Sequence, residues 1–396
     1  MTDLETRAAP SRAGALRRAA PALLGYAAVR GLGLITLALW SAARDKSAYT
    51  LLTARWDALW YTRVAELGYG YEVRLANGDV HSNLAFFPLL PWLERLVAAV
   101  SPLSYADGGF LVSLVASVAA AWGIFAVADH VYGRRAGVCA VLLWAVLPVG
   151  IVQSMAYSES LFTALAAWSL YAVLTGRWVT AGTLALLAGL TRPVGVAVVA
   201  AVWVAGIAAF ARERRAGPSA QERGDTDGAG PRTRRALGML LAPLGTAGYV
   251  LWVGHRTGKG PLGYLDVQAG WRNGFDGGYA FARFVAEKFT SFPSALAGAG
   301  LIAGVASVVW LYVVGVRQRQ PLPLLVYTGV VTALALCASS YFGSKPRLLM
   351  PAFPLLLPLA LALARPHLRR SALVLGPVAV ASAVYGAFWL NGSGPP

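Results

Sequence analysis

Charged side chains are scarce in this chain of 396 residues, at 13% of the total, whereas soluble domains carry about 25%. Hydrophobic residues make up 57%, and the mean hydropathy is +0.57. Such a composition excludes an ordinary soluble domain. It indicates an all-α, polytopic integral membrane protein, because helices satisfy their backbone hydrogen bonds within the bilayer.

Cysteine and histidine are also rare, and familiar nucleotide motifs are missing. Cys139 and Cys337 both lie inside apolar segments, and two cysteines are too few for a disulfide framework, so we expect free thiols. His81 and His255 lack the spacing of metal ligands, so we expect neither a metal nor another cofactor. The absence of a glycine-rich dinucleotide fingerprint and of a Walker loop argues against a user of nucleotide sugars or ATP.

Acidic residues number 18 against 34 Lys and Arg, which gives a net charge of +16. In a membrane protein such an excess normally gathers in cytoplasmic loops. With the N-terminus inside, 19 basic residues fall on the cytoplasmic side and 14 on the outer side, which also holds 11 of the acids. We therefore predict no nucleic-acid partner. We expect a multi-pass protein of the plasma membrane, surrounded by membrane lipids, with a cytoplasmic N-terminus and an extracytoplasmic active site.

Apolar runs of spanning or nearly spanning length predict about eleven transmembrane helices. They cover residues 20–41, 110–131, 136–153, 157–175, 178–191, 193–211, 236–254, 293–315, 322–340, 348–364 and 371–390. The run 83–102 is also apolar, but it contains Pro88, Pro91, Glu94 and Arg95. A crossing there would reverse every later loop against the charge rule, so we predict an amphipathic or re-entrant helix at the outer interface.

These boundaries divide the chain into a cytoplasmic tail at 1–19 and a single transmembrane domain at 20–396. Within that domain, 42–109 forms the first extracytoplasmic segment, where we expect interfacial helices. The segment 212–235 is rich in Arg, Gly and Asp and has no hydrophobic period, so we interpret it as a cytoplasmic linker.

The stretch 55–71 is the most informative part of the first outer segment. At about 100° per residue, Trp56, Trp60 and Tyr61 share one helix face with Asp57, and Gly68 is placed to end the helix. A carboxylate on a face that should be buried costs free energy unless it meets a charged or hydrogen-bonding partner. We interpret Asp57 as a functional residue, with simple helix capping as the alternative.

Four segments, taken in order, resemble the PIG-V family of GT-C-fold mannosyltransferases, related to the enzyme that adds the second mannose of glycosylphosphatidylinositol anchors. They are Arg-Trp-Asp-Ala-Leu-Trp-Tyr within 55–69, Phe-Phe-Pro-Leu-Leu-Pro-Trp within 85–95, Tyr-Ser-Glu-Ser within 156–162 and Leu-Thr-Arg-Pro within 189–195. The resemblance implies a GT-C fold, a polyprenyl-phosphate sugar as donor, typically phosphomannose, and an essential acid in the first outer loop.

That essential acid matches Asp57 in this sequence. The Ala- and Arg-rich composition is typical of a high-GC bacterium, in which no glycosylphosphatidylinositol acceptor is expected. We therefore expect a glycolipid, a glycan or a protein as acceptor on the outer side.

The expected chemistry assigns roles to the ionisable residues of the outer side. A lipid phosphosugar already carries its leaving group, so transfer needs a base for the acceptor hydroxyl and cations for the departing phosphate. We predict Asp57 as the base and Glu159, at the outer start of the fourth span, as a second catalytic acid, although a helix N-terminus alone would also stabilise Glu159. Arg192, Lys345 and Arg347 are the predicted phosphate ligands, with snorkelling to lipid headgroups as the alternative.

The predicted substrate-binding set consists of Trp56, Trp60, Tyr61, Glu66 and Tyr157. Aromatic residues at a membrane interface also serve simply as anchors. Glu66 lies on the opposite helix face, three residues after Arg63, so an ordinary surface ion pair is its alternative.

The function predicted from these residues is an inverting transfer of mannose from a polyprenyl-phosphate mannose donor to an extracytoplasmic acceptor. Transfer of another polyprenyl-phosphate sugar by the same mechanism is an alternative. A lipid-linked sugar flippase or transporter is a second alternative, although transporters place ionisable residues near the midplane, whereas here they cluster at the outer boundary. A non-catalytic membrane scaffold would leave Asp57 without a role.

Overall fold

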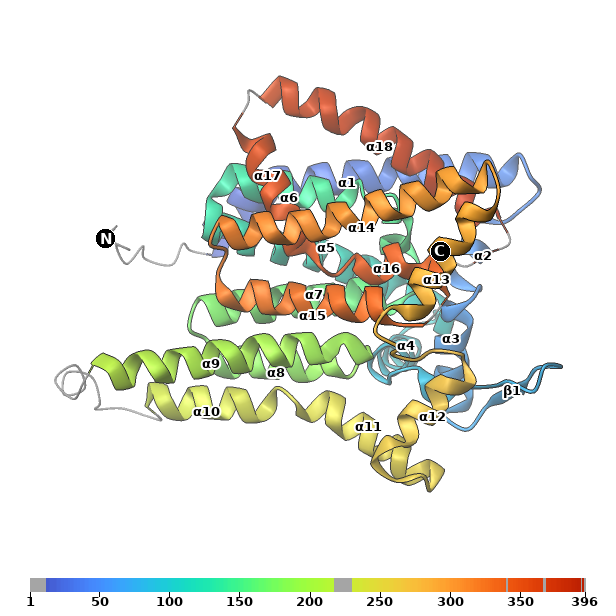
Figure 1. The fold of residues 1–396 in the computed structure, drawn as a ribbon, viewed down its shortest axis with the longest axis horizontal. Helices are drawn as coiled ribbons and strands as arrows, with labels where there is room; N and C mark the ends of the chain where they lie inside the picture. The colour runs from blue at the N-terminus through green and yellow to red at the C-terminus, as the bar shows by residue number, and fades with distance from the viewer. Residues whose placement is uncertain (1–11, 217–229, 340, 366–367, 393, 395–396) are drawn as a thin grey trace.

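The computed structural model describes residues 12–216, 230–339, 341–365, 368–392 and 394. Figure 1 shows the long helices side by side in one bundle, with the short helices gathered at one end, on the right. Residues 1–11 of the predicted tail and 217–229 of the predicted linker lie outside the described residues. The described flanks of both segments are helical, since the first helix begins at Arg12 and the helix before the linker continues to Ala216.

Six of the described helical segments are long and apolar enough to cross a membrane. They are formed by α1 (Arg12–Ala42), α5 (Tyr105–Tyr132), α9 (Val196–Ala216), α10 (Pro231–Leu241) with α11 (Leu244–Thr257), α14 (Ser294–Arg317) and α18 (Leu368–Leu390). A seventh crossing results if the segment with α16 (Lys345–Leu349) and α17 (Leu357–Ala364), bent by 76°, counts as one span. The described helices thus support a multi-pass membrane protein.

Several predicted spans are short in the structure. The apolar helices α7 (Ser158–Leu174), α8 (Trp178–Gly189) and α15 (Leu322–Cys337) have fewer than 18 residues. The predicted span 136–153 consists of α6 (Arg134–Ala145) followed by a 3-10 turn. The predicted count of eleven transmembrane helices is therefore not confirmed. Hydropathy measures the length of an apolar run but does not show where the helix within it breaks.

The end of the bundle on the right of Figure 1 carries short helices and one hairpin. The short helices are α2 (Ala48–Thr53), α3 (Asp57–Leu67), α4 (Leu89–Val100), α12 (Gly263–Gly270) and α13 (Tyr279–Glu287). Strands β1 (Glu72–Arg74) and β2 (Val80–Ser82) pair antiparallel, with Val73 opposite His81. The 3-10 turns are η1 (Asn83–Ala85), η2 (Gly150–Ser154), η3 (Pro193–Gly195), η5 (Gly260–Leu262), η6 (Lys288–Thr290), η7 (Phe342–Ser344) and η8 (Phe353–Leu356).

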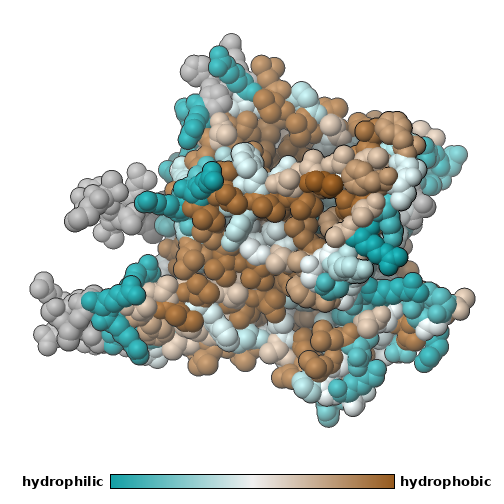
Figure 2. Space-filling model, viewed as in Figure 1, coloured by the Kyte–Doolittle hydropathy of each residue, from teal (hydrophilic) through white to brown (hydrophobic). Residues whose placement is uncertain are grey.

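Hydropathy on the molecular surface follows this arrangement. In Figure 2 a broad hydrophobic zone covers the middle of the bundle, and hydrophilic residues gather toward its two ends. The helix α4, within the run predicted to lie at the interface, has 12 residues and is about 18 Å long, too short for the roughly 30 Å of hydrocarbon in a bilayer.

The helix that the sequence predicts within 55–71, ended by Gly68, is present as α3. The helix α3 ends at Leu67, and Gly68 follows with a φ of 75°, a conformation that glycine adopts without strain. Tyr61 is buried, as expected for the predicted inner face, whereas Leu67 in the last turn of α3 is 62% exposed. Cys139 and Cys337 are free, as expected.

Small residues let several helices approach closely. A Cβ atom on Gly182 of α8 would lie 2.2 Å from the carbonyl oxygen of Gly238 in α10. One on Gly245 of α11 would lie 1.9 Å from the carbonyl oxygen of Leu186. Backbone therefore packs directly on backbone along α8, as is common between membrane helices.

Candidate active site

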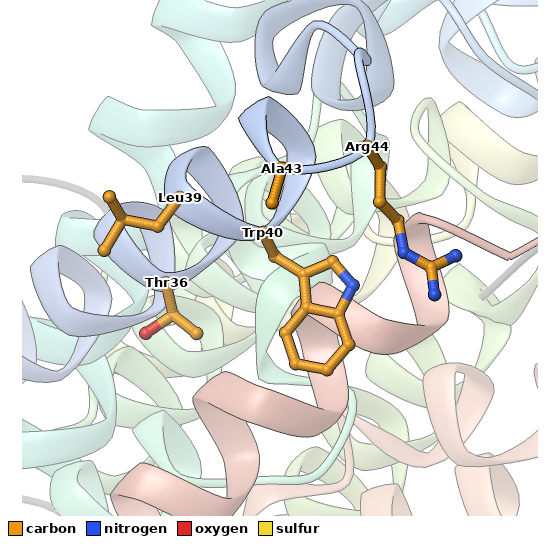
Figure 3. A pocket seen from close by; sticks show the side chains of 5 residues that line it. All are labelled: Thr36, Leu39, Trp40, Ala43 and Arg44. Atoms are coloured by element: carbon orange, nitrogen blue, oxygen red, sulfur yellow. The ribbon is translucent and has the colours of Figure 1, made fainter.

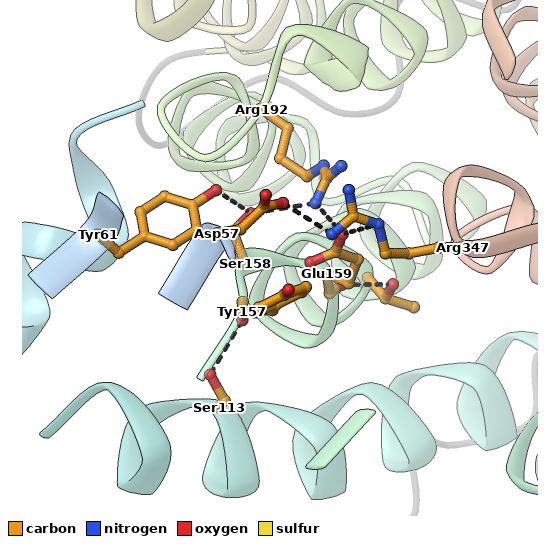
Figure 4. A network of polar contacts seen from close by, with 9 residues as sticks. Asp57, Tyr61, Ser113, Tyr157, Ser158, Glu159, Arg192 and Arg347 are labelled. Atoms are coloured by element: carbon orange, nitrogen blue, oxygen red, sulfur yellow. Dashed lines mark hydrogen bonds and ion pairs between the residues drawn. The ribbon is translucent and has the colours of Figure 1, made fainter. Parts of the chain in front are cut away.

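Four charged side chains from distant parts of the sequence converge in one polar cluster (Figure 4). Asp57 is the first residue of α3, and Glu159 lies in the first turn of α7. Arg192 directly precedes η3, in the turn after α8, and Arg347 belongs to α16. All four were predicted as site residues from the sequence, and the structure brings them into direct contact.

The contacts form a chain of alternating charge. Arg347 Nη1 donates to Asp57 Oδ2 at 2.7 Å, and Arg347 Nε lies 3.4 Å from Glu159 Oε1. The same oxygen of Glu159 lies 2.5 Å from Arg192 Nη1. Two carboxylates and two guanidinium groups balance each other, which is the usual condition for holding charges away from water.

Burial differs strongly between the two acids. The Glu159 side chain is 1% exposed and lies between both arginines, whereas the Asp57 side chain is 27% exposed. Arg347 and Arg192 have side chains 9% and 13% exposed. A ligand arriving from solvent therefore meets Asp57 first, while Glu159 is placed to orient the guanidinium groups.

Helix termini contribute to the electrostatics of both acids. Asp57 and Glu159 each lie in the first turn of a helix, where the unpaired backbone N–H groups favour negative charge. Trp56, immediately before Asp57, has φ 50° and ψ −123°, which side-chain-bearing residues seldom adopt. Strained backbone of this kind is often found at functional sites.

Hydroxyl groups connect the charged cluster to neighbouring helices. Ser158 Oγ lies 2.7 Å from the Tyr61 hydroxyl and accepts a hydrogen bond from Arg192 Nη1 at 3.2 Å. Ser113 Oγ of α5 donates to the Tyr157 carbonyl oxygen at 2.9 Å, and the Arg347 guanidinium carbon is 5.2 Å from the Tyr157 ring centroid. Burial raises the pKa of Tyr61 well above its usual range, so its phenol remains neutral.

Lys345 was predicted to bind phosphate beside these arginines, but the structure directs it elsewhere. Its Nζ donates to the carbonyl oxygens of Ala335, Leu336 and Ala338 at 2.8, 3.2 and 2.8 Å. Lys345 therefore satisfies the carbonyl groups at the end of α15, which a helix leaves unpaired.

Glu66 also lies apart from the cluster. It is exposed on α3, and no ion pair with Arg63 occurs among the residues that the structure describes. Arg63 instead donates to the Tyr71 hydroxyl at 2.5 Å and lies over that ring at 4.6 Å.

The predicted aromatic residues divide into different environments. Trp60 stacks on Phe86 with ring centroids 5.6 Å apart and meets the edge of Trp271 at 4.8 Å. Trp271 in turn stacks on His81 at 4.1 Å. Trp56 is covered by the Arg55 guanidinium, 4.0 Å from its ring centroid. Trp60 and Trp56 therefore pack against other side chains, and Tyr61 and Tyr157 adjoin the charged cluster.

Sequence reasoning missed several participants. Ser158 stands next to Glu159 in the segment Tyr-Ser-Glu-Ser, so the adjacency was an available signal. Ser113 and Trp271 lie on remote segments, and their spacing in the sequence carries no sign of these contacts.

A separate groove of about 430 Å³ lies at the end of α1 (Figure 3). It is lined by Thr36, Leu39, Trp40, Ala43 and Arg44. None of the charged cluster belongs to it. Within the described part of the chain, no three His, Cys, Asp or Glu side chains converge as metal ligands would.

No protein-family model and no curated protein sequence matches this chain. Solved structures do match it. Similarity to ArnT from Cupriavidus metallidurans bound to undecaprenyl phosphate covers 91% of this chain and 63% of that chain, with a TM-score of 0.52 and 14% identity. The chain has the GT-C fold. At this level of identity the likeness to ArnT shows the GT-C architecture and not the reaction.

The archaeal oligosaccharyltransferase AglB from Archaeoglobus fulgidus, in complex with an inhibitory peptide and a dolichol-phosphate, is another GT-C neighbour. It matches with a TM-score of 0.47 and 12% identity, over 94% of this chain and 56% of that chain. The chain spans less than two thirds of the length of both solved structures.

Proposed function

We propose that this GT-C protein is an inverting glycosyltransferase that moves mannose from a polyprenyl-phosphate mannose donor to an extracytoplasmic glycolipid, glycan or protein acceptor. The observation that carries the proposal is the contact of Arg347 with Asp57 at 2.7 Å, beside Glu159 and Arg192. A solvent-reachable carboxylate and two guanidinium groups therefore belong to one cluster, and the proposed transfer needs both a base and cations. The resemblance to the PIG-V family supports mannose as the sugar.

In the proposed reaction Asp57 is the general base. Its carboxylate takes the proton of the acceptor hydroxyl while that oxygen attacks the anomeric carbon of the sugar. The bond between this carbon and the phosphate oxygen breaks, and the electron pair leaves with the polyprenyl phosphate. Attack from the side opposite the leaving group inverts the anomeric centre, so a β-linked donor gives an α-linked product.

Arg347 and Arg192 are the proposed ligands of the leaving phosphate. Guanidinium groups bind phosphate oxygens through two N–H donors at once, and their charge stabilises the negative charge that develops on the leaving group. Glu159 is fully buried between the two arginines and would hold both guanidinium groups in place. Arg347 would then contact the donor phosphate and Asp57 at the same time.

The test is transfer of radiolabelled mannose from polyprenyl phosphomannose in membranes of a deletion strain, complemented with wild type or Asp57→Asn at equal expression. We expect a wild-type-dependent product and a loss of about 10²–10⁴-fold in the variant, the usual contribution of a general base. Asp45→Asn is the matched control. Asp45 is exposed in the same outer segment and has φ 54°, a conformation that Asn tolerates.

Full turnover by Asp57→Asn would refute the base role. If wild type transfers glucose or a pentose from the corresponding polyprenyl-phosphate sugar but does not transfer mannose, the proposed donor sugar is wrong and the proposed mechanism stands. If no sugar is transferred but lipid-linked sugar moves across liposomes containing the protein, the chain is a transporter.

A further inference from the structure

The residue before Asp57 holds an unfavourable backbone conformation. Trp56 has φ 50° and ψ −123°, a conformation that is unfavourable when a side chain is present. The turn at Trp56 joins α2 to α3 and sets the direction in which α3 begins. Because Asp57 is the first residue of α3, the same turn aims its carboxylate.

Arg55 is bound to this turn on one side and to the last helix on the other. Its guanidinium carbon lies 4.0 Å from the centroid of the Trp56 ring. Arg55 Nη1 donates to the carbonyl oxygen of Leu390 at 3.1 Å, and Nη1 and Nη2 both donate to that of Gly392 at 3.4 Å. Leu390 is the last residue of α18, where carbonyl groups lack helical partners and carry negative partial charge.

A second cation strengthens the same attachment. Lys46 Nζ donates to the carbonyl oxygen of Asn391 at 2.7 Å, and Asn391 Nδ2 donates to Ser41 Oγ at 3.1 Å. Asn391 is 2% exposed. Three consecutive carbonyl groups at the end of α18 are thus bound by side chains of the first outer segment, more than 330 residues earlier in the chain.

We propose that Arg55 is a positioning residue for Asp57. Held by the carbonyl groups at the end of α18, its guanidinium covers the Trp56 indole and keeps the strained turn in the conformation that aims Asp57 at Arg347. The end of α18 thereby supports the site through Arg55. The proposal rests on the proposed function only for its kinetic consequence, since the geometric consequence can be measured without turnover.

The chemistry of Arg explains why this residue type is needed. A guanidinium is planar, so it stacks on an indole and donates within its plane to two carbonyl groups at once. A Lys side chain carries the same charge as a compact ammonium and cannot do both. Arg55→Lys should therefore disturb the positioning of Asp57 nearly as much as Arg55→Gln does.

The first measurement is the rate at which a water-soluble carbodiimide modifies Asp57, followed by mass spectrometry on the purified full-length protein. In wild type the carboxylate is paired with Arg347, and in Arg55→Gln we expect it to react at least threefold faster. Arg63→Gln is the matched control, because Arg63 lies over Tyr71 on another face of α3. An unchanged rate in Arg55→Gln, or an equal rise in Arg63→Gln, overturns the proposal.

The second measurement separates positioning from binding. With polyprenyl phosphomannose as donor, Arg55→Gln should lower kcat about 10–100-fold and leave both the donor KM and the Kd for undecaprenyl phosphate within twofold. A raised KM with unchanged kcat would make Arg55 a binding residue instead. If wild type neither turns over the donor nor binds undecaprenyl phosphate, the proposed function fails, and the carbodiimide rates alone decide the positioning role.

A double variant tests the strained turn itself. Glycine adopts a φ of 50° without strain, so in Trp56→Gly the turn should no longer need Arg55 to keep its conformation. We expect Arg55→Gln to change the Asp57 modification rate less than 1.5-fold in the Trp56→Gly background. An undiminished effect there would show that Arg55 acts on Asp57 by another route.

Discussion

At the scale of single residues, the charged cluster is a set of mutually dependent side chains. Arg347 contacts both acids, and Glu159 contacts both arginines. Removing one member leaves a buried charge without its partner, which costs several kcal/mol. Conservative substitutions that keep the charge are therefore more informative than alanine.

Arg347→Lys keeps the positive charge but removes the guanidinium group, whose N–H donors point in several fixed directions. Arg347 reaches Asp57 through Nη1 and Glu159 through Nε, and one ammonium cannot occupy both positions. We expect sugar transfer to fall at least tenfold with a change in Tm of only a few degrees, measured on purified protein. Arg283→Lys, in an exposed pair with Glu287, is the control. Wild-type activity of Arg347→Lys would contradict the assignment of a bidentate role.

Glu94 on α4 is a second buried carboxyl group, with a different expected effect. It is 0% exposed, and neither oxygen has a hydrogen-bond partner within the described residues. Burial raises its pKa well above the usual range. The folded protein therefore binds more protons than the unfolded chain above about pH 4.3, and stability should fall as pH rises from there toward the folded pKa.

We predict that Glu94→Gln removes this loss, because the amide is an uncharged mimic of the protonated acid. Its Tm should exceed that of wild type at pH 8 and converge with it near pH 4.5, as measured by thermal unfolding in detergent. A variant that is less stable than wild type at pH 8 would show that the carboxylate is ionised and paired in the folded protein.

At the scale of secondary-structure elements, direct backbone packing decides which glycines matter. In α11 a Cβ atom on Gly245 would lie 1.9 Å from the Leu186 carbonyl oxygen, whereas one on Gly248 would meet nothing within 4 Å. Gly245 and Gly248 therefore have the same intrinsic helix propensity but different packing environments.

We expect Gly245→Ala to destabilise the protein by about 1–3 kcal/mol, because the backbone of α8 must move away. Gly248→Ala should be neutral or slightly stabilising, since alanine favours the helix. Thermal unfolding of both variants at equal detergent concentration measures the difference. Equal Tm values would indicate that α8 and α11 are not in direct backbone contact in the folded protein.

At the scale of the whole molecule, the predicted orientation follows from the distribution of basic residues. The loop at Asn77, in the hairpin, and the turn at Arg177, between α7 and α8, are both exposed. The charge rule places Asn77 outside and Arg177 inside.

Single cysteines test this orientation in a Cys139→Ser, Cys337→Ser background. A membrane-impermeant maleimide applied to intact cells should label Asn77→Cys, and Arg177→Cys only after the cells are permeabilised. The reverse pattern would place the charged cluster on the cytoplasmic side and exclude an extracytoplasmic acceptor.

The sequence by itself determined that the chain is a multi-pass helical membrane protein, that a helix ends at Gly68, and that Asp57, Glu159, Arg192 and Arg347 are the residues to examine. Composition and charge suffice for the first conclusion, because the bilayer penalises polar groups wherever the fold places them. The helix end follows from the glycine, and the choice of the four residues also used the resemblance to the PIG-V family. Glu159, Arg192 and Arg347 each lie near the end of an apolar run, which a hydropathy pattern reveals, and Asp57 lies in the outer segment between two runs.

Only the tertiary structure decided which of these groups meet. Asp57 pairs with Arg347 across 290 positions, whereas Lys345, two residues away, turns to the end of α15. Hydropathy locates the end of a helix along the chain but not its rotation about its own axis, and that rotation selects the partner. The bend of 76° in the segment containing α16 and the contact of Arg55 with the end of α18 likewise arise from packing between distant helices.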